Sequence, residues 1–250
     1  MTGALVAAAL AGLVLGSFAS LAAYRLPRGQ GIARGRSRCP ACGHALGPRD
    51  LVPVLSWLAL GGRCRYCAAQ VPVRYPLIEL ATAALFVLAV LARGAGPEAV
   101  MLCALALGLV IASVADLDRQ VIPDLVLAAL LPLGLGYRAS LGLPWSDTVA
   151  GLVAALALAS ALRWLGARLA GREALGLGDV KLLAVAGAWV GLAALPWFLV
   201  AAGALGLGLA LVWRLPRRNS RGRRLGAETF PFGPALAAAL YAAVLWPALS

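Results

Sequence analysis

Eight apolar runs, most of them separated by polar connections, dominate the pattern of hydrophobic and polar positions along the chain. The first run carries no charge over 21 residues, which is enough to span about 30 Å of hydrocarbon as a helix. The pattern therefore predicts an all-α polytopic membrane protein with about eight transmembrane helices. Because the fourth, fifth and sixth runs are short or interrupted, six or seven spans are also compatible with it. The runs are 3–23, 76–92, 99–115, 121–137, 148–162, 180–195, 196–213 and 230–249.

Composition supports a membrane protein. Hydrophobic residues make up 62% of the chain and charged residues 13%, against about 45–50% and about 25% in soluble domains. The net charge of +12 does not indicate nucleic-acid binding, because the basic residues cluster in connections between apolar runs. In the first run the positive charges follow the apolar stretch, at Arg25 and Arg28. A secretory signal carries them before it, so the run is interpreted as a retained span with its N-terminus outside.

The distribution of positive charge orients the predicted spans. If the N-terminus is outside, the inner connections hold 20 of the 22 lysines and arginines, and only Arg93 and Arg138 fall outside them. Such an excess on the inner side is the normal rule for membrane proteins. It predicts that Asp116 and Asp179 both lie at the cytoplasmic ends of their helices. The inner connections are 24–75, 116–120, 163–181 and 214–228.

The segment 24–75 contains two C-x-x-C pairs, and it predicts a small metal-binding domain. The pairs are Cys39 with Cys42 and Cys64 with Cys67, close to the spacing of four-thiolate zinc sites. Thiols in the cytosol stay reduced, and a loop with little core of its own needs a metal to hold its shape. A structural, zinc-ribbon-like site is therefore expected. The alternatives are an incidental redox pair and a loop without metal.

His44 and Cys103 are also of types that bind metals, but neither is expected to be a ligand of this site. His44 lies within the cysteine loop, and it is expected to support the site or to be exposed rather than to act as a fifth ligand. Cys103 falls inside an apolar run, where a packed core thiol is the simpler interpretation.

Asp116 and Asp179 are the candidate chemical groups. Asp116 ends an uncharged run, and Asp179 follows Gly176 and Gly178 in a G-x-G-D sequence. An ionised aspartate near hydrocarbon costs about 2.5–3.5 kcal/mol on insertion scales, so such residues usually have a function. If both lie on one side of the membrane, they would form an acid–base pair that shares a proton. The simpler alternative is a flexible loop in which Asp179 caps a helix.

Neighbouring carboxylates have plainer explanations. Asp118 lies beside Arg119 and is expected to be solvated. Pro123 and Asp124 fit the start of a helix, where proline and a carboxylate are both favoured.

In content and order, these motifs make the chain resemble the type IV prepilin peptidases, which are membrane aspartyl proteases with a G-x-G-D motif. The resemblance covers nearly the whole chain, although the C-terminal third is poorly diagnostic. It implies a division into a first transmembrane helix (1–23), a zinc-binding loop domain (24–75) and an aspartyl protease core (76–250). The residues that carry it are the opening apolar run, the paired C-x-x-C loop, the segment 74–79 (RYPLIE), the segment 116–123 and Gly176–Asp179.

The resemblance also implies an activity and a location. Asp116 and Asp179 would be the catalytic pair, with Gly176, Gly178 and Pro123 supporting the motifs. The substrate would be a prepilin or pseudopilin whose basic leader is cut at the cytoplasmic face of the bacterial inner membrane. Many members of the family also N-methylate the new amino terminus with S-adenosylmethionine. Glu79 would then serve methylation or substrate binding, unless it is an interfacial carboxylate paired with Arg74.

Two other functional classes fit parts of the sequence. A proton-coupled transporter would also carry membrane carboxylates, but carriers favour charges at the midplane and internal repeats. A non-catalytic assembly platform would use the zinc loop for docking. Membrane lipid is an expected partner in each case. The sequence determines neither the oligomeric state nor the pilus, secretion or DNA-uptake system that would supply a substrate.

Overall fold

The computed structural model describes residues 1–32, 35–170, 175–214 and 230–246. These residues form helices and connecting loops, and their only β-bridges are two isolated ones in the cysteine loop. The chain divides into two compact units, Met1–Val114 and Ala115–Ser250. The all-helical fold predicted from the apolar runs is therefore confirmed.

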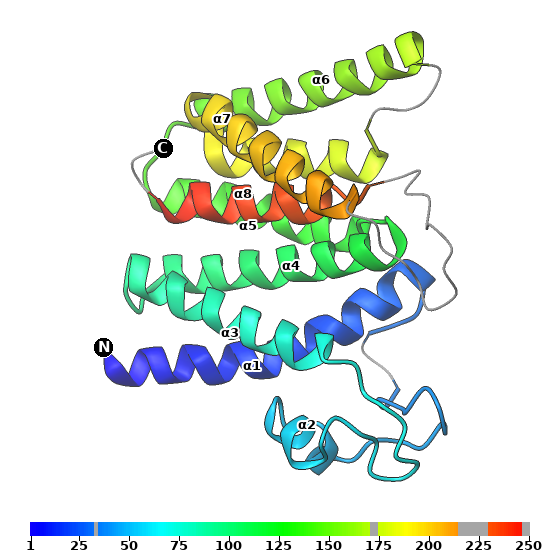
Figure 1. Ribbon diagram of the computed structural model, residues 1–250. Coiled ribbons are helices and arrows are strands. Elements are labelled where there is room, and N and C mark those ends of the chain that lie inside the picture. The colour runs from blue at the N-terminus through cyan, green and yellow to red at the C-terminus, as the bar shows by residue number, and fades with distance from the viewer. Residues whose placement is uncertain (33–34, 171–174, 215–229, 247–250) are drawn as a thin grey trace. The chain divides into compact units, whose positions relative to one another are not determined.

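Each long helix largely coincides with a predicted apolar run, although one of them joins two runs (Figure 1). The bounds of the helices are α1 Thr2–Arg25, α2 Leu55–Ala59, α3 Arg74–Arg93, α4 Pro97–Arg119, α5 Asp124–Ser140, α6 Trp145–Ala170, α7 Leu177–Arg214 and α8 Gly233–Leu245, with short 3-10 helices at Leu26–Arg28 and Pro48–Asp50. Except for its first residue, the basic connection 214–228 lies outside the described residues, as does the end of the last run beyond residue 246.

Five helices are long and apolar enough to cross a membrane: α1, α3, α4, α6 and α7. They make the chain a multi-pass membrane protein. Two further apolar helices are shorter, since α5 has 17 residues and α8 has 13. The predicted count of about eight spans is therefore not confirmed.

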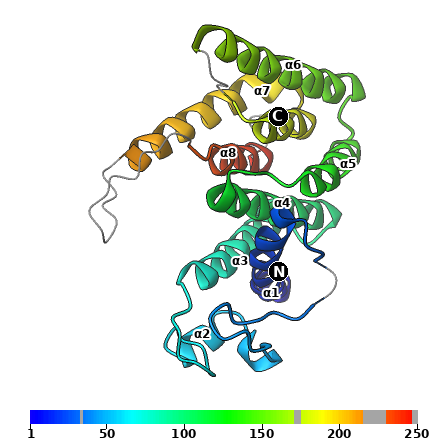
Figure 2. The same cartoon turned by 90° about the vertical axis from the view of Figure 1, so that its right-hand side faces the viewer.

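Glycines allow the helices of the first unit to approach closely. A Cβ added at Gly12 would lie 2.5 Å from Ala83 Cα, and one added at Gly16 would lie 2.7 Å from Glu79 Cα. Small residues at such contacts bring helix backbones together where lipid gives no hydrophobic driving force. They hold α1 alongside α3 (Figures 1 and 2). Gly16 lies opposite Glu79 at this contact. In the same unit, the half-buried thiol of Cys103 lies 3.9 Å from the Phe86 carbonyl oxygen, as a packed thiol would.

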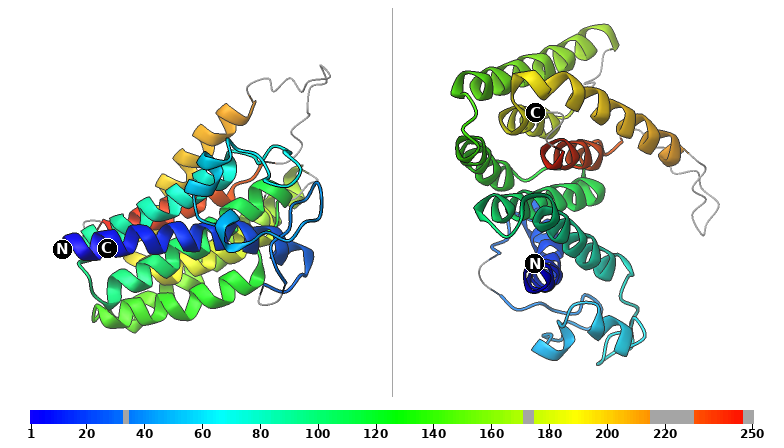
Figure 3. Two further views of the ribbon diagram at one scale, coloured as in Figure 1. Left: turned by 90° about the horizontal axis from the view of Figure 1, so that it is seen from below. Right: turned by 90° about the vertical axis from the view of Figure 1, so that its left-hand side faces the viewer.

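The second unit is held together in the same way, with a tryptophan added. A Cβ at Gly151 would lie 2.5 Å from the Gly187 carbonyl oxygen, so α6 and α7 meet backbone to backbone (Figure 3). On another face of α7, the Trp189 ring packs against Gly134 of α5. Its indole N–H donates to the Leu130 carbonyl at 2.9 Å. These contacts fix the rotation of α7 against both neighbours.

Helix α7 joins two runs that the sequence divides at residue 195. The observed break lies earlier, at Gly191, whose φ of 78° and ψ of 174° are not helical, and Pro196 lies inside the continuing helix. The expected boundary was therefore misplaced. The physical reason is that positive φ is easily adopted by glycine, so the chain turns at Gly191.

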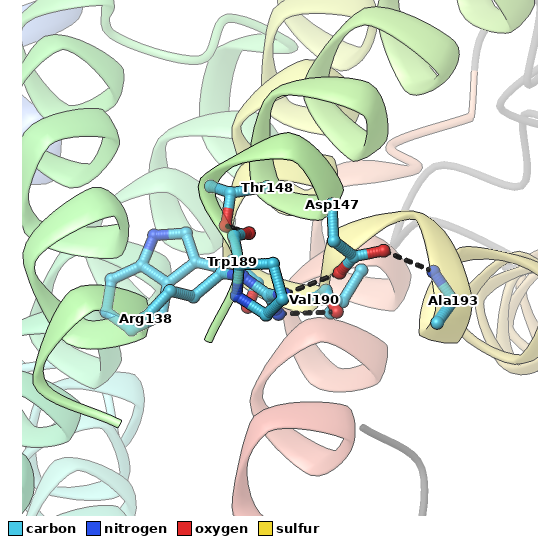
Figure 4. Close-up of polar contacts among 7 residues, drawn as sticks. Arg138, Asp147, Thr148, Trp189, Val190 and Ala193 are labelled. Carbon is cyan, nitrogen blue, oxygen red and sulfur yellow. Dashed lines mark hydrogen bonds and ion pairs between the residues drawn. The ribbon is translucent and has the colours of Figure 1, made fainter. Parts of the chain in front are cut away.

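A buried arginine satisfies the carbonyls at this break. Arg138 is only 3% exposed, although the charge pattern led us to expect it outside the spans. Its guanidinium donates to Thr148 Oγ1 at 2.7 Å, to the Val190 carbonyl at 2.8 Å and to Asp147 Oδ2 at 2.5 Å (Figure 4). Carbonyls left open inside an apolar protein cost several kcal/mol each. Arg138, on α5, provides a hydrogen bond to the Val190 carbonyl at this break.

Asp147 completes the arrangement from the other side of the break. Its Oδ1 accepts the Ala193 N–H at 3.2 Å, at the start of the second half of α7 (Figure 4). The cation therefore lies at the C-terminal end of one half-helix and the anion at the N-terminal end of the next. Each charge stabilises the helix end that it faces.

Replacing Asp147 by alanine is expected to destabilise the protein strongly. The change would leave the Arg138 charge buried without its carboxylate, which typically costs about 3–5 kcal/mol. Thermal unfolding of the purified protein in detergent would measure the loss. The control is Asp124→Ala, which breaks the exposed pair with Lys181 and should cost at most about 1 kcal/mol. Equal effects of the two changes would contradict this assignment.

Candidate functional site

Asp116 is held by a backbone amide from a distant part of the sequence. It lies in the last turn of α4 and is 5% exposed. Its Oδ2 accepts the Gly233 N–H at 2.8 Å, at the N-terminal end of α8. The end of the α4 backbone is closed by Gln120, whose N–H donates to the Asp116 carbonyl at 2.8 Å with a φ of 54°. The carboxylate therefore faces the positive end of a helix dipole, which favours an anion.

Asp179 lies in the first turn of α7, directly after the glycine pair. Its Oδ1 is buried, and among the described residues it has no hydrogen-bond partner. A Cβ at Gly176 would lie 3.3 Å from Asp179 Oδ2, so a larger residue would press on the carboxylate. The Leu175 carbonyl, just before the motif, accepts a hydrogen bond from Arg163 of α6 at 2.8 Å. The loop is thus fixed, while one buried carboxylate oxygen of Asp179 has no hydrogen-bond partner among the described residues.

Two contacts bring the segment after Asp116 against the G-x-G-D segment. Gly178 packs on Ile122, where an added Cβ would lie 3.2 Å from the isoleucine Cβ. Two residues beyond Asp179, Lys181 Nζ donates to Asp124 Oδ1 at 2.7 Å. The second glycine of the motif therefore has a steric purpose, because a side chain there would separate the two segments.

The two predicted aspartates consequently lie in one unit and at one site. Asp116 lies close enough to Asp179 for their carboxylates to interact electrostatically. Asp118, two residues further on, is exposed, as expected for a solvated carboxylate. Pro123 has extended backbone and precedes α5, so it ends the connection next to Ile122. The arrangement places two carboxylates at the ends of two apolar helices. Such a pair can act as a general acid and a general base.

Sequence reasoning missed Gly233, which contributes to this site. It lies in the sequence Pro231-Phe232-Gly233-Pro234 at the start of α8. An added Cβ at Gly233 would lie 2.8 Å from Asp116 Oδ2. A glycine between two prolines at the edge of an apolar run was the available signal, because it marks a close backbone approach at a helix start.

The four predicted cysteines form one cluster in the first unit. Their sulfur atoms all lie within 4.8 Å of one another. Each pair sits on the same kind of turn: the Gly43 N–H donates to the Cys39 carbonyl and the Ala68 N–H to the Cys64 carbonyl. Both turn residues have positive φ, 71° and 55°. Two equivalent turns thus present four thiols to one point.

The sulfur spacing fits a tetrahedral metal ion. Bonds of about 2.3 Å place the sulfurs of a tetrahedral zinc site about 3.8 Å apart, and Cys39 Sγ lies 3.8 Å from Cys67 Sγ. Backbone N–H groups of Cys42 and Ala41 lower the pKa of Cys39 to about 6. The Ala69 N–H lowers the pKa of Cys67, but desolvation and the neighbouring thiols outweigh it and raise that pKa to about 12. Without a cation, the four thiols would not all ionise together.

Surrounding side chains hold the second turn. Arg65 Nε donates to Asp50 Oδ1 at 2.7 Å, and this hydrogen bond is the main reason why the pKa of Asp50 is lowered. The Tyr66 hydroxyl donates to the same carboxylate at 3.3 Å. His44 is exposed and stacks on the Tyr66 ring with centroids 3.6 Å apart. It supports the loop and is not part of the cysteine cluster.

Glu79 is buried and bound to the cysteine loop. It is 7% exposed, and its Oε2 accepts the Val54 N–H at 2.7 Å. Val54 has a φ of 59° and a ψ of −50°, and the Leu55 N–H donates to the Pro53 carbonyl at 2.5 Å, which makes a γ-turn of the strained kind. A β-branched residue adopts such a conformation only where its surroundings impose it. The Glu79 carboxylate is one such constraint.

Comparison with known proteins agrees with this architecture. Residues 10–93 match the Bacterial Peptidase A24 N-terminal domain, and residues 103–211 match the Type IV leader peptidase family. A "Type 4 prepilin-like proteins leader peptide-processing enzyme" of Escherichia coli O78:H11 is 36% identical, over 92% of this chain and 90% of the relative. A "Prepilin leader peptidase/N-methyltransferase" of Pseudomonas putida is 34% identical, over 96% and 89%. The chain belongs to the type IV leader peptidase family.

A "Prepilin leader peptidase/N-methyltransferase" of Burkholderia pseudomallei is 40% identical, over 85% of this chain and 68% of its own length. No solved structure matches significantly.

Proposed function

We propose that this protein is an aspartic endopeptidase that removes the leader from type IV prepilins or pseudopilins, with Asp116 and Asp179 as its catalytic pair. The observation that carries the proposal is the convergence of these two carboxylates, from the end of α4 and the start of α7, within one unit. Membership of the family and the names of the relatives support the same activity.

The chemistry follows from two carboxylates that hold one proton between them. The ionised carboxylate takes a proton from water as the water attacks the scissile carbonyl, and the protonated one donates to the carbonyl oxygen and then to the leaving amine. The Gly233 N–H fixes Asp116 during these transfers. Asp179 offers the oxygen that has no partner within the described residues. Hydrolysis by this route needs no covalent intermediate.

The proposed orientation places this chemistry at the cytoplasmic face of the inner membrane, with the N-terminus outside. The excess of arginine and lysine in the connections supports it. A prepilin leader is basic and precedes an apolar helix, so the scissile bond would lie where the spans emerge from the lipid. The positions of Asp116 in the last turn of α4 and of Asp179 in the first turn of α7 support this proposal.

The cysteine cluster is proposed to hold one structural zinc ion through Cys39, Cys42, Cys64 and Cys67. Its sulfur spacing and its four-thiolate donor set support zinc. Four protein ligands complete a tetrahedral site and leave no position for substrate. When bound, the ion would fix the loop by neutralising thiolates that otherwise repel one another.

N-methylation of the new amino terminus is proposed as a second activity, in keeping with the names of the relatives. Glu79 would act on methylation or substrate binding through the loop that it holds, because its Oε2 is already engaged by Val54. The transporter and platform alternatives are less favoured, because the relatives are named as processing enzymes.

Asp179→Asn is expected to lower the cleavage of a prepilin-like peptide in detergent by about 10²- to 10⁴-fold, as loss of a positioned acid–base group does. The control is Asp118→Asn, which alters an exposed carboxylate nearby and should leave cleavage unchanged. Thermal unfolding would show that both variants are folded. Full activity of the Asp179 variant would refute the assignment. Radiolabelled methyl donor in the same assay would detect N-methylation.

Gly233→Ala is expected to reduce cleavage without unfolding the protein. The added Cβ would meet Asp116 Oδ2 at 2.8 Å and push the carboxylate away from its amide donor. Displacing a catalytic group by about 1 Å can cost about 100-fold in rate. Gly208→Ala adds the same methyl group where nothing lies within 4 Å, and it should be neutral. The assignment fails if the two variants cleave equally well.

Cys64→Ser is expected to lower the zinc content from about one ion per chain, because it removes one of four thiolate ligands. Elemental analysis of protein purified without added metal would measure the loss. Cys103→Ser alters the cysteine outside the cluster and should leave the zinc content unchanged. Equal zinc in all three proteins would exclude the cluster as the binding site.

A further inference from the structure

Helix α2 and the residues before it carry an exposed apolar face. Leu55 and Leu58 are 65% and 60% exposed, and Leu51 and Val52 just before them are also exposed. A cluster of exposed apolar side chains marks a surface that meets a partner or lipid.

The direction of this face is fixed by the opposite side of the same short helix. Trp57 points into the loop, where its indole N–H donates to the Val71 carbonyl at 2.9 Å. Gly62, with a φ of 69°, lies against the Trp57 ring, and an added Cβ there would be 2.9 Å from it. Leu55 and Leu58 are therefore held outward by the packing of Trp57.

The depth of the face is set by the contact between Glu79 and Val54. Glu79 lies opposite Gly16, and α1 continues nine residues further, to Arg25, which is about 13 Å of helix. The turn before α2 is bonded to Glu79, so α2 lies beside the apolar length of α1 and not beyond its end (Figures 1 and 3). On α3, Glu79 is five residues inside Arg74, or about 7 Å. With the membrane surface at the end of α1 and the start of α3, marked by Arg25 and Arg74, the leucines would lie at the level of the outer acyl chains.

Charge around the face fits an anionic membrane surface. The segment 24–75 contains nine arginines and one acidic residue, Asp50. Arg49, Arg63 and Arg65, which flank α2 in sequence, are exposed. Segments that lie in a membrane interface place apolar side chains about 5–10 Å into the acyl boundary and basic side chains among the phosphates.

We infer that α2 is an interfacial anchor, with Leu55 and Leu58 inserted among the acyl chains of an anionic leaflet and the surrounding arginines at its phosphates. The anchor sets the height of the metal-binding loop above the membrane. It does not depend on the proposed peptidase activity. The partner is the lipid surface itself, whereas an apolar helix of a substrate or a second copy of the chain would cover the face with protein.

A fluorescent amino acid placed at position 58 or 55 of the full chain in phosphatidylglycerol-containing vesicles tests this inference. Quenching by nitroxides on the lipid chains should match that at position 91, an exposed leucine of α3, to within about twofold. Iodide in the water should quench little. Position 30, an exposed residue beyond the end of α1, should show the reverse. Thermal unfolding would confirm that each labelled protein is folded.

Two results would overturn the inference. Iodide quenching at positions 55 and 58 equal to that at position 30 would place α2 in water. Protection from both quenchers would show that protein covers the face. Vesicles of zwitterionic lipid alone test whether anionic headgroups attract the arginines. Without those headgroups, lipid quenching at position 58 should fall by about twofold or more. Unchanged quenching would remove the anionic lipid from the proposal.

Discussion

The hydrogen bond from the Gly233 amide to Asp116 is the interaction on which the proposed active site depends. A carboxylate at the end of an apolar helix needs a donor, because water is scarce there and an unsatisfied charge is costly. The chain provides that donor at the start of α8, more than a hundred residues later in the sequence. Asp116 therefore has a defined position before any substrate binds. The packing of Gly178 on Ile122 then brings Asp179 to the same place.

The need of buried polar groups for hydrogen-bond partners also explains the rest of the second unit. Helix α7 breaks at Gly191, and the freed backbone groups are met by Arg138 and Asp147. Trp189 and the glycines on α5 and α6 fix the rotation of its first half, which carries Asp179 at its other end. Catalytic groups need placement within a fraction of an ångström, and such placement comes from packed supporting residues. A polar clamp at one end of a half-helix thus supports the position of a carboxylate at the other.

In the first unit, a loop with little core of its own is ordered by three different devices. The cysteine cluster closes its two turns, Trp57 fills its interior, and Glu79 ties its strained turn to α3. Because Glu79 also lies against Gly16 of α1, the position of the loop is coupled to the packing of two spans. A polar loop of about fifty residues is marginal by itself, and such cross-links compensate for its small hydrophobic burial.

The sequence by itself determined the features that depend on local pattern: helical runs from hydropathy, the four thiols from their spacing, and Asp116 and Asp179 from their positions at the ends of apolar runs. The division into domains and the roles of the site residues remain predictions. The sequence did not reveal the partners of Gly233, Arg138 and Glu79, and it misplaced the break in α7 at residue 195. Only the tertiary structure decided these, because each depends on which helix faces which across long stretches of chain. Local periodicity records that a residue is apolar or charged, but not which distant amide, carbonyl or carboxylate will satisfy it.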